Sequence, residues 1–349
     1  MKVLFLYTEL ASYFLKCCEE LSKRNEVHII RWPVNKEAPF EFETGGTIRL
    51  YAKKDYSFSG LIQLVKNINP DMIICSGWID REYLRICRSY FGKIPTVMTC
   101  DTSWKGSFRQ YLATALSRLT LLRIFSNAWV PGHAQRRYVE KLGFENNRIE
   151  EKFYCCDLEQ FNSIYDKRRA AADFGKTKRF LYIGRYYDFK GLPELWDAFA
   201  ELKREDPNDW ELWCVGTGGI EGVQSPGIRH FGFVQPKDLG VILLQCTVFI
   251  LPSRFEPWAV VSQEMAAAGF PLILSSAVGS AERFLEEGKN GYNFIAGDST
   301  SLLKQMKKII HLSSAELSKM SEHSHSLAQS ITPAEWVNCV DRMYNGIKN

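Results

Sequence analysis

The chain has 349 residues, of which 46% are hydrophobic and 24% are charged, and its formal net charge is +4. This length exceeds what one hydrophobic core usually fills, so we expect two domains of roughly 150–180 residues each. The small charge gives no indication of nucleic-acid binding, and no apolar run approaches the roughly 18–20 residues that a membrane-spanning helix needs.

Strand-like and helix-like segments alternate through the N-terminal half. The expected strands are Lys2–Tyr7, Val27–Arg31, Asp71–Cys75, Thr96–Cys100 and Ala128–Val130. The expected helices are Tyr13–Arg24, Phe58–Ile68, Arg81–Tyr90, a long helix over 107–124, and Ala134–Leu142. Residues 32–55 are less regular. This alternation is typical of a parallel sheet covered on both faces, which predicts an α/β fold.

The alternation weakens between Cys155 and Lys178, and we expect the domain junction there, with domains at 1–165 and 166–332. A second series of strands follows, at Phe180–Ile183, Glu211–Val215, Arg229–Phe231, Val248–Leu251 and Pro271–Ser275. The tail from Pro333 to Ile347 has the pattern of an amphipathic helix.

The ten cysteines form no Cys-x-x-Cys pair, and most lie in apolar strand or helix patterns. Cysteine in such patterns acts as a small hydrophobic residue. We therefore expect neither a zinc site nor a disulfide framework, and a reducing cytosol is the simplest setting.

Two carboxylates follow the apolar run that ends at Leu251. Glu256 lies in a loop bounded by prolines, and Glu264 lies eight positions later on an expected helix. A helix that follows a strand presents free N–H groups and a positive dipole end, which suit a phosphate. A carboxylate there can accept hydrogen bonds from sugar or ribose hydroxyls. Two solvated glutamates beside an ordinary helix are the alternative.

The residues around these glutamates carry a resemblance to a known family. The segment reads Pro252-Ser253-Arg254-Phe255-Glu256-Pro257-Trp258, and Glu264-Met265-Ala266-Ala267-Ala268-Gly269 follows it. Upstream lie Tyr182-Ile183-Gly184-Arg185 and Asp188-Phe189-Lys190-Gly191. Together they resemble the donor site of the retaining glycosyltransferases of family 4, most specifically over 181–291. The resemblance implies the GT-B fold: two facing Rossmann-like domains with an inter-domain cleft, and a final helix over 333–349 that crosses back to the first domain.

In that family the Arg and Lys of the upstream segment hold the diphosphate of the donor, which assigns this role to Arg185 and Lys190. Cations fixed beside a leaving diphosphate stabilise the charge that develops on it as the bond breaks. A surface Arg and Lys beside a turn are the alternative. The sequence contains no Asp-x-Asp, which suits catalysis without a metal or other cofactor.

The resemblance also implies the remaining donor contacts. Glu256 would position the donor sugar and Glu264 the ribose. Further binding residues would be Gly184, Phe233, Val234, Trp258, Ala259 and Val260. Gly216 is a candidate from its own Gly-rich turn and not from the resemblance. The turn at Gly216 fits a close approach to a ligand and fits a plain strand-to-helix turn equally well.

The N-terminal half departs from the family pattern. The loop after the first strand lacks glycine, and Cys100 stands where many members have a catalytic His. Asp101 either takes over as a hydrogen-bond acceptor to the donor sugar or the incoming hydroxyl, or it caps a helix. His133 is interpreted as structural.

The segment 105–125 mixes Lys105, Arg109, Arg118 and Arg123 with aromatic and aliphatic residues. Such a basic amphipathic helix can lie in a membrane interface. The alternative is that its apolar face packs on the sheet.

The sequence thus predicts a retaining, hexosyltransferase-type enzyme that moves a sugar from a nucleotide-diphosphate donor to a hydroxyl acceptor, expected to be a glycan or a lipid-linked precursor of a polysaccharide. We expect it in the cytoplasm, with peripheral contact to the inner membrane face left open, and with no nucleic acid as partner. A non-catalytic sugar-nucleotide-binding subunit and a sugar-nucleotide epimerase of the GT-B fold are the alternatives.

Overall fold

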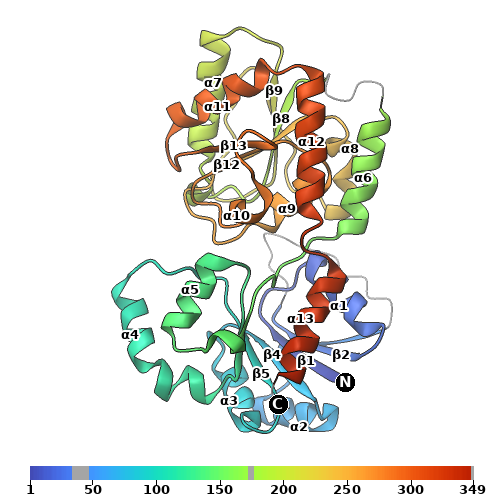
Figure 1. The fold of residues 1–349 in the computed structure, drawn as a ribbon, viewed down its shortest axis with the longest axis vertical. Helices are drawn as coiled ribbons and strands as arrows, with labels where there is room; N and C mark the ends of the chain where they lie inside the picture. The colour runs from blue at the N-terminus through green and yellow to red at the C-terminus, as the bar shows by residue number, and fades with distance from the viewer. Residues whose placement is uncertain (34–46, 172–176, 347–349) are drawn as a thin grey trace. The chain divides into compact units, whose positions relative to one another are not determined.

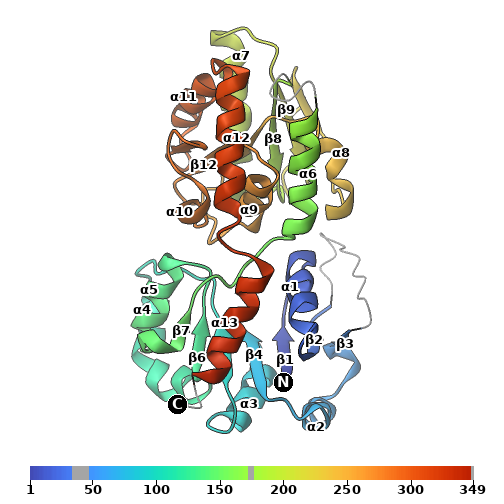
Figure 2. The same cartoon turned by 45° about the vertical axis from the view of Figure 1, so that its right-hand side comes forward.

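The computed structural model describes residues 1–33, 47–171 and 177–346. The chain forms two compact units (Figures 1 and 2). Unit 1 comprises Met1–Cys155 and Ile331–Asn349, and unit 2 comprises Cys156–Ser330. The chain therefore passes between units at 155/156 and again at 330/331, ten residues before the junction expected at 165/166 and two before the one expected at 332/333. Most of the irregular segment 32–55, and Ile347 at the end of the tail, lie outside the described residues.

The described part of unit 1 contains a parallel sheet of seven strands in the order β3-β2-β1-β4-β5-β6-β7. The strands are β1 Lys2–Tyr7, β2 Glu26–Arg31, β3 Ile48–Ala52, β4 Met72–Ser76, β5 Thr96–Thr99, β6 Asn127–Trp129 and β7 Ile149–Glu150. The helices are α1 Ser12–Ser22, α2 Phe58–Ile68, α3 Arg81–Tyr90, α4 Phe108–Leu116, α5 His133–Lys141 and α13 Pro333–Asn345. The central strands are apolar on both faces and almost fully buried, as a parallel sheet between two helix layers requires.

The described part of unit 2 repeats this plan with six parallel strands in the order β10-β9-β8-β11-β12-β13. They are β8 Arg179–Ile183, β9 Glu211–Val215, β10 Ile228–His230, β11 Val248–Leu251, β12 Leu272–Ser275 and β13 Gly291–Phe294. The helices are α6 Leu158–Ala170, α7 Leu192–Glu205, α8 Gly240–Leu243, α9 Val260–Ala267, α10 Ala281–Phe284, α11 Ser299–Ile310 and α12 Ser314–Ala328. Two Rossmann-like units with parallel sheets confirm the predicted fold class.

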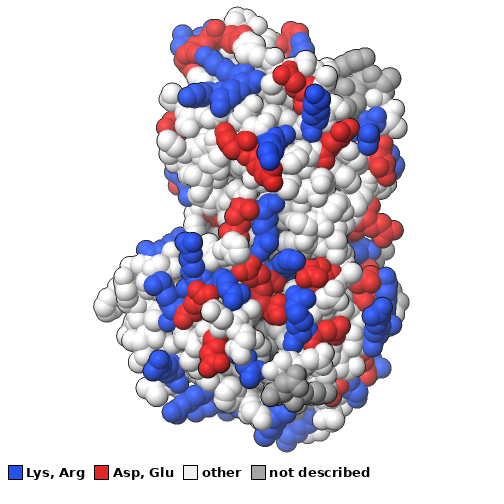
Figure 3. All heavy atoms as spheres, in the orientation of Figure 1, with Lys and Arg blue, Asp and Glu red and all other residues white. Residues whose placement is uncertain are grey.

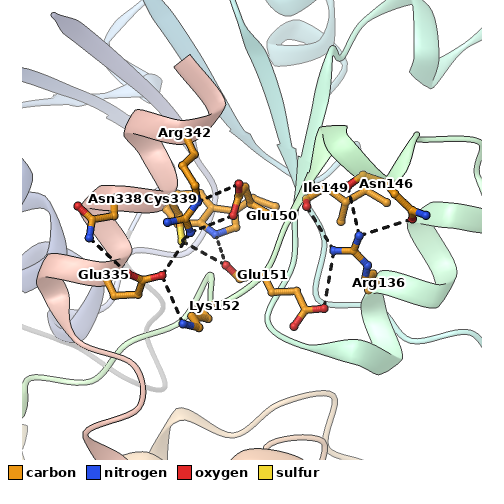
Figure 4. Close-up of polar contacts among 11 residues, drawn as sticks. Arg136, Asn146, Ile149, Glu150, Glu151, Lys152, Glu335, Asn338, Cys339 and Arg342 are labelled. Atoms are coloured by element: carbon orange, nitrogen blue, oxygen red, sulfur yellow. Dashed lines mark hydrogen bonds and ion pairs between the residues drawn. The ribbon is translucent and has the colours of Figure 1, made fainter. Parts of the chain in front are cut away.

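The last helix, α13, belongs to unit 1, where it packs against α1. Trp336 is fully buried and lies among aromatic rings, with Trp129 at 4.7 Å and Phe5 at 6.1 Å between ring centroids. At the helix surface, Arg342 makes a two-pronged ion pair with Glu150 at 3.1 Å (Figure 4). An apolar core contact therefore fixes α13, and ion pairs add contacts at its edge.

The segment 107–124 is not one long helix. It breaks into α4, Phe108–Leu116, and two 3-10 turns at Ser117–Leu119 and Leu121–Arg123. The apolar face of α4 does not pack on the sheet either, because Phe108 and Tyr111 are 82% and 60% exposed. The core includes Leu121 and Ile124 from the end of the segment, followed by Phe125, and Ala113 and Leu122 pack partly buried against it.

Candidate functional site

The candidate site lies at the carboxyl ends of β8 and β11, which are neighbours in the sheet of unit 2. From β8 the chain continues to β9 on one side, and from β11 it continues to β12 on the other. This is the topological switch point of the sheet, where open α/β sheets bind their ligands. The loop Gly184–Gly191 leaves β8 there, and the loop Pro252–Ala259 leaves β11.

The two loops are held together by their backbones. The carbonyl oxygen of Phe189 accepts hydrogen bonds from the N–H groups of Arg254, at 2.8 Å, and Phe255, at 3.2 Å. Gly191 has a φ of +70°, and a Cβ atom there would lie 2.1 Å from the carbonyl oxygen of Pro252. Only glycine permits this approach. Gly191, which follows Lys190 in the sequence motif, therefore allows the second loop to lie against the first.

The side chains of Lys190 and Glu256 meet across these loops. The Lys190 ammonium donates a hydrogen bond to Glu256 Oε2, and the two side chains are only 15% and 13% exposed. The Ser253 hydroxyl donates to the same carboxylate oxygen at 3.3 Å. A cation from one strand–helix loop and a carboxylate from the next thus form a largely buried pair.

The N-terminus of α9 follows Glu256 after three residues. Its first residue is Val260, and the preceding Ala259 has a φ of +77° and gives no side-chain cap. Left-handed backbone at a non-glycine residue is strained and is often found at functional sites. The first N–H groups of a helix have no partner within it, so an uncapped end offers them to an anion. Trp258 is buried, and its carbonyl oxygen accepts from Ser280 N–H at 2.9 Å, which fixes the approach to the helix.

Glu264 lies in the second turn of α9, beside the Asp157 carboxylate that caps α6. Loss of solvent, and to a smaller extent the nearby Asp157 charge, raise the pKa of Glu264 to about 7. The side chain nevertheless keeps part of its surface exposed. The Glu264 carboxylate is therefore poorly hydrated but still accessible to a ligand hydroxyl.

The strands on the other side of β8 bring further predicted residues to this edge. Gly216 follows β9, and a Cβ atom on it would lie 1.9 Å from the carbonyl oxygen of Gly184 after β8. The Gly216 N–H donates to the Gly232 carbonyl at 2.7 Å, which ties in the loop after β10 that carries Phe233 and Val234. Both of those residues are partly exposed. The predicted base-binding residues therefore follow adjacent strands.

Arg185 lies at the same sheet edge and is exposed. Its carbonyl oxygen accepts a hydrogen bond from the Tyr182 hydroxyl at 2.9 Å, and its guanidinium lies 5.6 Å from the centre of the Tyr187 ring. Among the described residues it makes no hydrogen bond with the Lys190–Glu256 pair. The second predicted cation is thus anchored by its backbone, with its head group extended into solvent.

Asp101 belongs to unit 1, in the irregular stretch after β5, and it is exposed. The Tyr154 hydroxyl donates to its Oδ2 at 3.3 Å. The alternative in which Asp101 caps a helix is wrong, because Ser107 caps α4 with a reciprocal bond to Gln110. His133 pairs with Glu151 at 2.9 Å on the surface of the same unit.

Sequence reasoning gave no role to Arg254, although it lies inside the Pro-Ser-x-x-Glu-Pro segment. Its guanidinium pairs with Asp188 at 3.0 Å and with Glu194. These contacts join the second loop to the first loop and to the start of α7. The available signal was that Asp188 and Arg254 are opposite charges in two segments already expected to converge.

In the described ranges, no group of three or more His, Cys, Asp or Glu side chains is arranged to hold a metal ion. All ten cysteines are free and buried. No helix within those ranges has the length and apolar character needed to cross a membrane.

Known proteins resemble both the sequence and the fold. Residues 177–311 match the family described as glycosyl transferases group 1. Spore coat protein SA of Bacillus subtilis is 29% identical over 142 residues, 36% of this chain and 37% of that protein. The glycogen synthase of Mycobacterium tuberculosis is 27% identical over 256 residues, 69% of this chain and 60% of that protein. The matches thus span less than two thirds of either relative.

A solved structure extends the likeness to the whole chain. HepE of Anabaena, in complex with UDP, superposes with a TM-score of 0.71 and 16% identity over 98% of each chain. At this identity the likeness shows the fold, which is that of the GT-B class. The family match covers the part of unit 2 that contains both loops of the candidate site.

Proposed function

We propose that the protein is a glycosyltransferase that takes a sugar from a nucleoside-diphosphate donor bound in unit 2. The observation that carries the proposal is the Lys190–Glu256 pair, formed across two strand–helix loops at the switch point of the sheet. The match of residues 177–311 to glycosyl transferases group 1, and the UDP in the HepE structure, support a nucleotide sugar as ligand.

In this proposal the leaving diphosphate displaces the contact between Lys190 and Glu256. Lys190 and the exposed Arg185 then face the phosphate oxygens, together with the uncapped N–H groups at Val260. These charges stabilise the diphosphate most as the glycosidic bond breaks, which is what catalysis requires. Glu256, released from Lys190, accepts hydrogen bonds from the donor sugar. No metal ion is needed in this scheme.

Glu264 would accept the ribose hydroxyls, and Phe233 and Val234 would lie beside the base. By the family resemblance, transfer proceeds through an oxocarbenium-like transition state with retention of the anomeric configuration. The acceptor is a hydroxyl of a glycan or of a lipid-linked glycan, met from unit 1, where Asp101 positions it. We place the reaction in the cytoplasm.

The first test measures turnover in Lys190→Ala and Arg185→Ala, with a panel of nucleotide sugars as donors and with EDTA present or absent. Loss of one charge-stabilising group lowers kcat by about 10²–10³-fold. The control is Lys289→Ala, which removes an exposed lysine of the same unit that pairs with Glu286. Full turnover in Lys190→Ala would refute the proposed role of the pair, and loss of turnover in EDTA would refute the metal-free scheme.

The second test separates transfer from its two rivals. Calorimetry finds the donor, and product analysis with and without acceptor follows. Conversion of the donor without acceptor would identify an epimerase. Binding without turnover under any acceptor would identify a non-catalytic subunit.

A further inference from the structure

Helix α4 of unit 1 exposes its apolar side to solvent, whereas an ordinary amphipathic helix buries that side. Its exposed side carries Phe108, Leu112 and Leu116, spaced by four residues, with exposed fractions of 82%, 50% and 45%. Tyr111 and Leu119, 60% and 62% exposed, flank this row. A surface helix normally turns such a row toward the core.

The side of α4 that faces the protein is polar. Gln110 is the buried residue of the helix, and its amide nitrogen donates to the Ser103 carbonyl at 2.8 Å. Just beyond the helix, the buried Ser117 hydroxyl donates to the Leu142 carbonyl at 2.5 Å. Polar hydrogen bonds therefore hold the helix in place with its apolar row outward. Turning the helix over would break these bonds, and the carbonyls of Ser103 and Leu142 would lose these donors.

The charged residues of the sequence segment that carries this row have one sign. No Asp or Glu occurs between Asp101 and Glu140. Within that stretch Lys105, Arg109, Arg118 and Arg123 are all exposed. Elsewhere on the visible face of the molecule both signs are interspersed, whereas the edge of unit 1 at α4 is largely uncharged (Figures 1 and 3).

We propose that α4 and the 3-10 turn after it form a membrane-docking surface, in which the Phe108–Leu112–Leu116 row enters the interface of an anionic bilayer. An apolar row flanked by basic residues and free of carboxylates matches a lipid interface, where acyl chains meet negatively charged headgroups. A protein partner would equally cover the apolar row, but it would not require a 38-residue stretch without acidic side chains. The inference does not rest on the proposed function.

The first step of the test is vesicle co-sedimentation of the full-length protein, without substrate. The vesicles contain phosphatidylcholine alone or with about one third phosphatidylglycerol. The wild type should bind the anionic vesicles, and binding should weaken with salt as surface charges are screened. Phe108→Ser/Leu112→Ser should lower the partition coefficient at least tenfold. Arg109→Gln/Arg118→Gln should lower it about fivefold for each charge on anionic vesicles and should change nothing on neutral ones.

The matched control is Val241→Ser/Leu244→Ser, which removes two apolar side chains, 71% and 41% exposed, from the α8 region of unit 2. It should bind vesicles like the wild type. The α4 residues are on the surface, so the variants should keep the far-ultraviolet circular dichroism and thermal midpoint of the wild type.

Three outcomes would overturn the proposal. One is wild-type protein that stays in the supernatant with anionic vesicles. Another is equal binding by the wild type and Phe108→Ser/Leu112→Ser. The third is a wild-type dimer in light scattering that the same variant converts to a monomer, since the row would then join two copies of the chain. Vesicle binding by a protein with no transferase activity would leave the docking surface intact and refute only the proposed function.

Discussion

Glu264 has a pKa that folding raises, and the direction of this shift gives a prediction. Its pKa rises from 4.5 to about 7, mainly because it loses solvent. Between these pH values the native state keeps a proton that the unfolded state has released, so the free energy of unfolding falls as pH rises. Glu264→Gln should thus stabilise the protein by roughly 1–3 kcal/mol at pH 8 and leave it unchanged near pH 4.5.

Urea unfolding across this pH range measures the effect, with the exposed Glu221→Gln as control. If the ionised form of Glu264 binds the ribose, nucleotide affinity in the wild type should also rise through pH 7, and the Gln variant should bind weakly at every pH. A wild type whose unfolding free energy does not change relative to the Gln variant between pH 5 and pH 8 would show that the carboxyl is well solvated.

At the scale of single residues, the sequence predicted which residues belong to the site better than it predicted which of their side chains are in contact. Motif positions placed Lys190 and Glu256 at one strand edge, and the structure brings them together although they are 66 residues apart. The motif could not show that they pair with each other, because an ion pair depends on side-chain directions set by both loops. Arg254 was missed for the same reason. Whether Arg185 serves the diphosphate remains a prediction.

The close approach of the backbone at Gly216, after β9, to the backbone at Gly184, after β8, gives a second prediction. Gly216 has a φ of +135°, and its missing Cβ makes room for the Gly184 carbonyl at the end of β8. Gly216→Ala adds both backbone strain and a clash, so it should shift the ends of β8 and β9 and weaken nucleotide binding at least tenfold. Gly232→Ala is the control, since Gly232 also has a positive φ, +70°, but open space around its Cβ position. Calorimetry should show nearly normal binding in Gly232→Ala; equal losses in both variants would make strain alone the cause.

Arg168 gives a prediction about how α6 joins its neighbours. It is 4% exposed, donates to the carbonyls of Leu243 and Cys246 at 2.7 Å each, and lies 3.5 Å over the Phe270 ring. Burial lowers its pKa to about 9. Arg168→Ala would leave those two buried carbonyls without the guanidinium donor. It should destabilise unit 2 by about 3 kcal/mol in urea unfolding.

The neighbouring Arg169 is the control, because it is 62% exposed and pairs with Glu322 on the surface. Arg169→Ala should change stability by less than about 1 kcal/mol. Arg168→Lys should not rescue the fold, because an ammonium cannot reproduce the planar guanidinium fork. Full stability in Arg168→Lys would mean that charge alone matters at this place.

Elements were predictable where local pattern and burial agree. β1, β9 and β11 are strands over the expected residues. Their largely apolar runs are buried on both faces only in a parallel sheet that helices cover on both sides. The sequence did not predict that α4 ends at Leu116, and it did not predict that the apolar side of α4 faces solvent. Its apolar residues have helical spacing and usually indicate a buried face; the hydrogen bonds of Gln110 and Ser117, which turn that face outward, depend on tertiary contacts.

At the scale of the molecule, the division of the chain predicts two separable stability effects. Unit 1 contains α13 although unit 2 lies between α13 and the rest of unit 1 in the sequence. Trp336 is fully buried, and its indole N–H donates to the Phe153 carbonyl at 2.7 Å. Trp336→Ala removes a large core side chain and should destabilise unit 1 by about 3–5 kcal/mol.

Hydrogen exchange followed by mass spectrometry locates this effect. In Trp336→Ala, exchange should accelerate in β1, β6 and α1, while nucleotide should still protect α9 and the loop after β8. The matched variant is Phe199→Ala, which removes a fully buried ring from α7 of unit 2 and should show the reverse pattern. Because the nucleotide binds the native form of unit 2, it should offset the loss in Phe199→Ala, by about 2.7 kcal/mol at a hundredfold excess over Kd, and should not offset the loss in Trp336→Ala. Equal rescue of both variants would mean that the two units unfold as one cooperative body.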